Sequence, residues 1–109
     1  MNLPTEIFGD VMVVHTPEEL GADQASIFQD RLAQADQVRI VIDLDNTESL
    51  DSAGLTAILN AQDELRDRGG DLKISTTNAT NRLILEITRL EEQLDVFESV
   101  IEAVKSFRE

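Results

Sequence analysis

The chain has 109 residues, and 22 acidic against 9 basic side chains give it a formal net charge of -13. A length of this size suits one domain, which we expect to span residues 1–109. The absence of cysteine excludes disulfides and thiolate metal sites. Nucleic acids and anionic membrane surfaces are bound through basic faces, so the acidity counts against both. It favours a basic protein partner, or it serves only solubility.

The sequence also predicts where the protein resides. No apolar run approaches the roughly 18 residues of a membrane-spanning helix, so no membrane insertion is expected. The first ten residues, MNLPTEIFGD, lack the basic and apolar regions of a signal peptide. We therefore expect a cytoplasmic protein.

The first third of the chain predicts a hairpin followed by a helix. Residues 5–8 and 11–14 are strand-like and flank the turn signal Gly9-Asp10. Thr16 is placed to cap a helix that begins at Pro17, with Glu19 completing a capping box. This helix carries an apolar stripe at helical spacing, formed by Ala25, Phe28 and Leu32.

Three further strands are expected. Residues 38–44, VRIVIDL, are β-branched and apolar, which is typical of a central strand. Residues 71–76 alternate between polar and apolar side chains, and residues 94–97 suit a short edge strand.

Three further helices alternate with these strands. Residues 52–66 form a helix that Gly69-Gly70 ends, and its apolar face is Leu55, Ile58, Leu59 and Leu65. The next helix is capped by Asn78 or Thr80, and its apolar positions are Leu83, Ile84, Ile87 and Leu90. The last spans residues 99–107, with one face made of Val100, Ile101, Val104 and Phe107.

This order of elements predicts an α/β domain. Strands that alternate with helices favour parallel pairing, and function in such sheets tends to lie where a strand's carboxyl end leads into the next helix. We expect a mixed central sheet of four to five strands flanked by about four helices. The connection after residue 44 is therefore the first place to look for a site.

That connection carries the motif Asp51-Ser52-Ala53-Gly54 at the start of the expected helix. Unpaired backbone N–H groups and the positive end of the helix dipole would meet a phosphate on Ser52 there. Gly54 lacks a side chain, so another surface could approach the backbone closely. The simpler interpretation is an ordinary helix cap, for which serine and aspartate are preferred residues.

The whole arrangement resembles the STAS domain family, named for sulphate transporters and anti-sigma factor antagonists. The resemblance extends over nearly the whole chain and is strongest in residues 38–59 and 81–104. The family pattern is a hydrophobic strand, a short loop, and Asp-Ser-Ser/Thr-Gly-Leu opening a helix, which corresponds here to residues 51–55. Ala53 replaces the second hydroxyl residue and leaves Ser52 intact.

The resemblance implies a function as an anti-sigma factor antagonist. Ser52 would be the phosphoacceptor, and residues 51–54 would bind the partner: Asp51, Ser52, Ala53 and Gly54. The partner implied is an anti-sigma factor that is also a serine kinase and supplies the ATP, with a serine phosphatase resetting the cycle. The chain itself would be a kinase substrate, with no enzymatic activity, cofactor or metal of its own.

One family feature is missing. The family often carries Gly-x-x-Asp between the early strand and the first helix, where this chain has Val14-His15-Thr16-Pro17. Glu18, Glu19 or Asp23 could take the place of that aspartate. The difference bears on the choice of partner more than on the fold.

Two alternative functions stay open. A STAS subunit of another assembly, such as a lipid-transport complex or a stress-sensing scaffold, would use Ser52 only as a cap. Residues 41–47, VIDLDNT, also resemble the first motif of haloacid-dehalogenase-type phosphatases, which would make Asp43 the nucleophile of a small Mg²⁺-dependent enzyme. The chain lacks a convincing set of later groups for that chemistry. His15, the only histidine, is interpreted as a strand-end residue without a special task.

Overall fold

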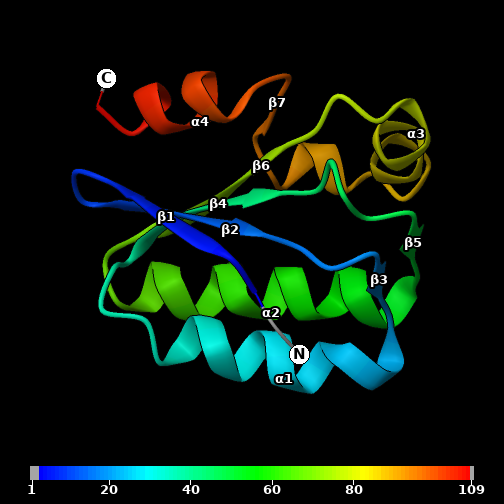
Figure 1. The fold of residues 1–109 in the computed structure, drawn as a ribbon, viewed down its shortest axis with the longest axis horizontal. Coiled ribbons are helices and arrows are strands. Elements are labelled where there is room, and N and C mark those ends of the chain that lie inside the picture. Colours follow the sequence, from blue (N-terminus) through cyan, green and yellow to red (C-terminus); the bar gives the residue numbers. More distant parts are fainter. Residues whose placement is uncertain (1–2, 109) are drawn as a thin grey trace.

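A five-stranded mixed sheet forms the centre of the computed structural model, which describes residues 3–108 (Figure 1). Its strands, in spatial order, are β1 (Thr5–Phe8), β2 (Val11–His15), β4 (Arg39–Asp43), β6 (Asp71–Ser75) and β7 (Val96–Phe97). β1 and β2 are the antiparallel hairpin that the sequence predicts, and all other pairs are parallel. The expected α/β architecture is confirmed.

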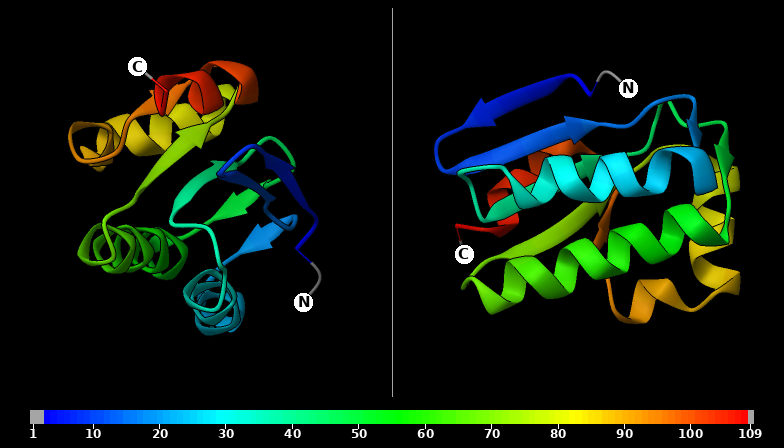
Figure 2. Two further views of the ribbon diagram at one scale, coloured as in Figure 1. Left: turned by 90° about the vertical axis from the view of Figure 1, so that its left-hand side faces the viewer. Right: turned by 90° about the horizontal axis from the view of Figure 1, so that it is seen from below.

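The helices cover the sheet in two layers, which Figure 2 shows from the side. α1 (Ala22–Ala33) and α2 (Ser52–Asp67) lie together on one face. α4 (Val100–Ser106) covers the other face. α3 (Ala79–Ile87) and the short 3-10 helix η1 (Leu90–Glu92) lie beyond the carboxyl ends of the strands (Figure 1) and contribute Leu85 and Leu90 to the larger core cluster. No helix within residues 3–108 is both long and apolar enough to cross a membrane.

Strand alternation divides the core into two parts. Side chains at even positions of the central strands, such as Ile40 and Ile42, enter the larger cluster with Phe28, Ile58 and Leu65 from α1 and α2. Side chains at odd positions, such as Val13 and Val41, pack against Ala103 and Val104 of α4. β2 and β4 are therefore apolar on both faces, as expected for strands covered on both sides.

The expected helix start at Thr16 is wrong. Glu19–Leu20 instead forms β3, a two-residue strand parallel to β5 (Ser49–Leu50), and α1 begins only at Ala22 with Gly21 as its N-cap. The Gly21 N–H donates to the Gln24 side chain, so half of a capping box forms five residues later than expected. Pairing with a distant strand overrode a local start signal.

The apolar face expected for α3 is only half right, because Ile84 packs against the larger core cluster but two of the other expected positions do not. Leu83 and Ile87 are 52% and 72% exposed, whereas Asn81 and Leu85 are buried. Leu90 is buried but lies beyond the helix, because Arg89 adopts a left-handed conformation with φ of 62°. In α4, Val100, Val104 and Phe107 pack as expected, but Ile101 is 62% exposed.

Candidate functional site

Ser52 is the first residue of α2 and its side chain is exposed. Asp51 is the N-cap, and its Oδ1 accepts the Gly54 N–H at 3.0 Å. The unpaired N–H groups of the first turn and the positive helix end therefore surround an accessible hydroxyl. The first turn can host a negative group there without burying it.

The close approach expected at Gly54 is made by the chain's own backbone. A Cβ on Gly54 would lie 2.1 Å from the carbonyl oxygen of Leu20 in β3, so only glycine lets β3 reach the helix. The N–H groups of Glu48 and Ser49 donate to the Glu18 carbonyl at 2.8 and 3.1 Å. β3 thus holds both the end of the loop and the first turn of α2.

A buried amide fixes the loop that precedes the motif. Asn81 of α3 is 1% exposed, and its Nδ2 donates to the carbonyls of Leu44 and Thr47 at 3.1 and 2.8 Å. The Thr47 hydroxyl donates to the Pro17 carbonyl at 2.6 Å and contacts the Thr16 hydroxyl. These contacts anchor residues 44–47 to α3 and to the segment after β2.

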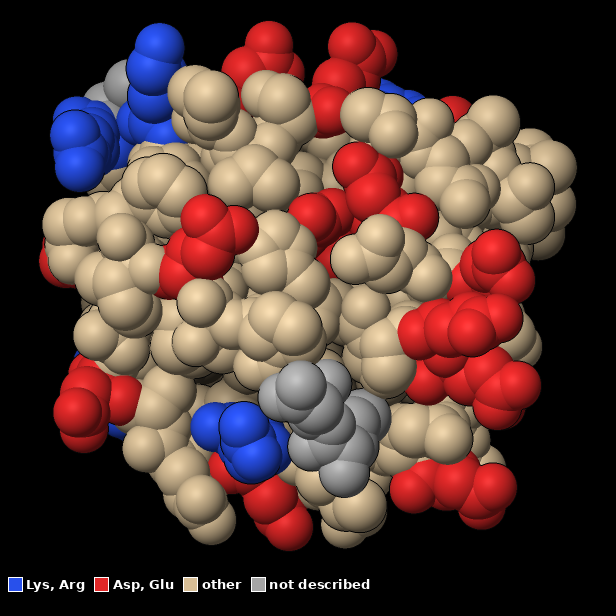
Figure 3. Space-filling view, viewed as in Figure 1, with Lys and Arg blue, Asp and Glu red and all other residues tan. Residues whose placement is uncertain are grey.

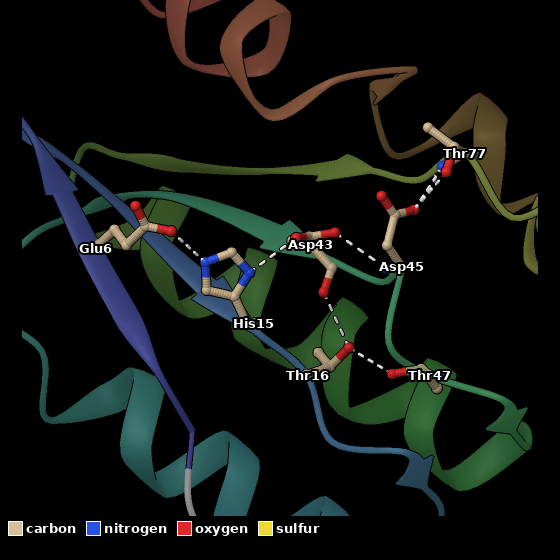
Figure 4. A network of polar contacts seen from close by, with 7 residues as sticks. All are labelled: Glu6, His15, Thr16, Asp43, Asp45, Thr47 and Thr77. Carbon is tan, nitrogen blue, oxygen red and sulfur yellow. Dashed lines mark hydrogen bonds and ion pairs between the residues drawn. The ribbon is translucent and has the colours of Figure 1, made fainter.

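The same loop is tied to its neighbours by two aspartates, shown with their partners in Figure 4. Asp45 Oδ1 accepts the Thr77 N–H at 2.6 Å, and Asp43 Oδ1 accepts the Asp45 N–H at 3.0 Å. The second oxygen of Asp43 lies 2.8 Å from His15 Nδ1. Both oxygens of Asp43 are engaged and the residue is 8% exposed, an arrangement that does not suit the nucleophile of a phosphatase.

Burial and neighbouring charges change the pKa of His15 in opposite directions. Burial lowers the pKa of His15, but its hydrogen bonds to Glu6 and Asp43 and the negative charges of these carboxylates raise it more, so the pKa lies above its ordinary value of 6.5. The sequence interpretation of His15 as a strand end without a special task is therefore wrong.

A groove of about 480 Å³ runs between α1 and α2 and includes Ser52 in its wall. Small and polar side chains line it, among them Ala25, Ser26, Ala53 and Thr56. Such a lining permits the backbone of another chain to come close, and it offers hydroxyl groups for hydrogen bonds. The accessible serine and this groove form one continuous surface.

Three acidic residues could take the place of the family's aspartate, and they lie in β3, just before it, or at the start of α1. Glu18 and Glu19 are exposed beside β5, with Glu19 in register with Ser49, and Asp23 is in the first turn of α1. Acidic side chains are spread over the face in Figure 3, and basic ones occupy a few isolated places.

Within residues 3–108, no three His, Cys, Asp or Glu side chains are grouped as a metal site would require.

The sequence predicted only some of the residues that form this site. The motif residues 51–54 come together at the helix start as the sequence predicts. Asn81, Thr47 and His15, which hold the loop beneath them, were not predicted as site residues. Their signal was weak: an asparagine inside an apolar helix pattern, a threonine in a polar loop and a single histidine at a strand end.

The fold and the motif together define a known class of domain. The family model for the STAS domain matches residues 2–103, and the chain belongs to this family. It is 25% identical over 109 residues to a Thermotoga maritima protein named "Putative anti-sigma factor antagonist", with 96% of each chain covered. The crystal structure of that protein has a TM-score of 0.86 and 24% identity and covers 98% of this chain and 95% of its own.

Two structures of another relative, SpoIIAA, share the fold at lower identity. The structure titled anti-sigma factor antagonist SpoIIAA in its unphosphorylated form has a TM-score of 0.80 and 17% identity, covering 98% of this chain and 96% of its own. The Bacillus SpoIIAA structure in the phosphorylated form has a TM-score of 0.72 and 16% identity, covering 97% and 99%.

Proposed function

We propose that this chain is an anti-sigma factor antagonist, a protein-binding module switched by phosphorylation of Ser52. The observation that carries the proposal is the exposed Ser52 hydroxyl on the first turn of α2, at the wall of the α1/α2 groove. The names of the Thermotoga relative and of SpoIIAA support the role, and the phosphorylated SpoIIAA structure supports the type of switch.

Phosphorylation acts on binding through charge. A phosphate adds about −1.5 to −2 charges next to Asp51, and the N-terminus of α2 stabilises that charge in the free protein. A partner seated in the groove would have to desolvate the phosphate or face it with a like charge, which is unfavourable. The phosphorylated protein thus stays folded and loses its partner.

A cycle of binding and release follows from the different partner affinities of the unphosphorylated and phosphorylated protein. Unphosphorylated protein binds an anti-sigma factor that is also a serine kinase, and this frees the sigma factor. The kinase supplies the ATP and phosphorylates Ser52, after which the complex dissociates and a serine phosphatase resets the protein. This cycle takes place in the cytoplasm, with Asp51, Ser52 and Ala53 at the contact and Gly54 packing the motif onto β3.

The test is a pull-down from the native cell's lysate with wild type, Ser52→Ala and Ser52→Asp as baits. We expect an ATP-binding serine kinase with wild type and Ser52→Ala but not with Ser52→Asp, and one added phosphate on recovered wild type by intact mass. Thr80→Asp is the matched control, because it adds the same charge to an exposed position in the first turn of α3.

Equal partner capture by all baits, with no phosphate on Ser52, would contradict the switch. It would make Ser52 a plain helix-start residue in a STAS subunit of another assembly. Hydrolysis of a generic phosphoester with Mg²⁺, lost in Asp43→Asn, would contradict the non-enzymatic role.

A further inference from the structure

His15 stands between two carboxylates that belong to different strands (Figure 4). Its Nδ1 is 2.8 Å from Asp43 Oδ2 on β4, and its Nε2 is 2.6 Å from Glu6 Oε1 on β1. The side chains of His15 and Asp43 are 20% and 11% exposed, whereas that of Glu6 is 55% exposed. The imidazole therefore connects the edge hairpin with a largely buried carboxylate at the carboxyl end of β4.

This geometry requires the charged form of the histidine. A neutral imidazole has one N–H and one lone pair, so it can donate to one carboxylate only and turns a lone pair toward the other. The imidazolium donates to both and compensates the buried negative charge of Asp43. Both observed contacts are satisfied together only when His15 is protonated.

Asp43 also accepts hydrogen bonds from the loop that leads to Ser52 and from the segment after β2. Its Oδ1 accepts the Asp45 N–H at 3.0 Å, and its carbonyl accepts the Thr16 N–H at 3.1 Å. Asp45 in turn holds Thr77, and Thr16 contacts Thr47. The carboxylate that His15 compensates therefore holds the start of the loop over residues 44–48 through the Asp45 N–H, whereas the Thr16 bond uses the backbone of Asp43.

We propose that protonated His15 is a positioning residue for the Ser52 loop, and that it acts through Asp43. Deprotonation of His15 leaves the buried carboxylate of Asp43 without a compensating cation, which is unfavourable. The carboxylate then favours a position closer to water, and its bond with the Asp45 N–H weakens. The first residues of the loop are then held less firmly, while Asn81 and Thr47 still anchor its end. The effect on partner binding rests on the proposed function, but the positioning itself does not.

Among residues 3–108, the charged side chains around this group offer no replacement for His15. The next strand, β6, presents Ser75 in register with Asp43. Its Lys73, on the same face, has its Nζ bonded to the Ser106 hydroxyl and 4.3 Å from the Phe107 ring centroid. On α4, the element that covers this face, Glu102 and Lys105 are exposed. The carboxylate of Asp45 is directed to Thr77.

The direction of the pH dependence follows from the raised pKa. The folded pKa of His15 exceeds the unfolded value of 6.5, so its contribution to the folded state is complete below about pH 6.5. That contribution is lost as the pH rises through the folded pKa. The Ser52 loop is therefore expected to be fixed at pH values below the folded pKa of His15 and loosened above it.

The test follows the histidine and the loop separately by nuclear magnetic resonance between pH 5.5 and 9, on the full-length unphosphorylated chain. We expect the ring protons of His15 to titrate above pH 6.5. The amides of Asp45, Thr47 and Glu48 should shift with the same midpoint and lose protection above it, measured relative to the intrinsic, base-catalysed exchange rate at each pH. Glu6→Gln, a change at a half-exposed position, should move both midpoints to lower pH, and His15→Gln should abolish the loop titration.

The matched control is Asp10→Asn, which removes the exposed Asp10–Arg39 ion pair of the same hairpin and should leave both midpoints unchanged. The proposal is overturned if the loop amides do not follow the histidine, or if Glu6→Gln leaves the midpoints unchanged. A loop that titrates with His15 while no partner distinguishes the Ser52 variants would leave the positioning intact and contradict the proposed function. Ser52 variants that differ in partner binding, in a protein whose loop does not titrate with His15, would contradict the positioning alone.

Discussion

Gly54 shows how one residue determines the geometry of the site. Its backbone lies against the Leu20 carbonyl, and the contact places β3 beside the first turn of α2. The sequence indicated a close approach here but not by which group. The group is part of the same chain, so Gly54 shapes the surface that carries Ser52 without being exposed itself.

Replacing Gly54 by alanine sets two effects against each other. Alanine is the better helix former by about 1 kcal/mol, which would stabilise α2. The new Cβ would lie 2.1 Å from the Leu20 oxygen, and overpacking of this kind costs about 1–3 kcal/mol or more. We expect a net loss of stability in urea denaturation.

Ala53→Gly is the control for helix propensity, because it changes the neighbouring position without a steric clash. It should cost about 1 kcal/mol or less. A Gly54→Ala protein that is as stable as wild type would show that β3 can move away from α2 at little cost.

At the scale of elements, α3 shows why apolar periodicity was misleading. The sequence favours the face that carries Leu83 and Ile87, yet the helix turns Asn81 and Leu85 inward. Asn81 donates to the carbonyls of Leu44, which also accepts the Thr47 N–H, and of Thr47. Leaving a buried carbonyl without a donor costs about 1–3 kcal/mol. A polar anchor therefore determines which face of α3 is buried.

Alanine substitutions along α3 test this orientation. Leu85→Ala should destabilise the protein by about 2–5 kcal/mol, because Leu85 is 1% exposed in the main core. Ile87→Ala removes a comparable side chain that is 72% exposed and should change stability by no more than about 0.5 kcal/mol. Thermal and urea unfolding measure both, and a larger loss for Ile87→Ala than for Leu85→Ala would mean that the opposite face is buried.

At the scale of the whole molecule, the net charge of -13 dominates. Excess charge of one sign destabilises a compact state by self-repulsion, and dissolved salt screens that repulsion. Asp63 and Asp67 illustrate it locally: both are exposed, four positions apart, and near the negative end of α2.

We expect the melting temperature to rise when sodium chloride is increased from low to physiological concentration. Asp67→Asn should raise the melting temperature at low salt, and this gain should shrink as salt is added. Glu102→Gln in the first turn of α4 is the control, because an acid there is favoured by its helix dipole. A gain for Asp67→Asn that is independent of salt would contradict an electrostatic origin.

The sequence by itself determined the order of the five strands of the main sheet and the four α-helices, and the position of Ser52 at a helix start. These features depend on neighbours within a few positions: a β-branched run for β4, an Asp cap for α2, and Gly69-Gly70 after it. Local rules failed where a distant partner competed, as β5 did for residues 19–20 and the loop carbonyls did for Asn81.

Only the tertiary structure decided what lies beneath and beside Ser52. His15 and Asp43 are 28 positions apart in the chain, and Asn81 and Leu44 are 37 apart, so no local spacing reveals that they meet. The parallel register of β2 and β4 brings the first pair together, and the packing of α3 brings the second. The serine was predictable because its neighbours in sequence place it, whereas its support is set by contacts that exist only after the sheet has formed.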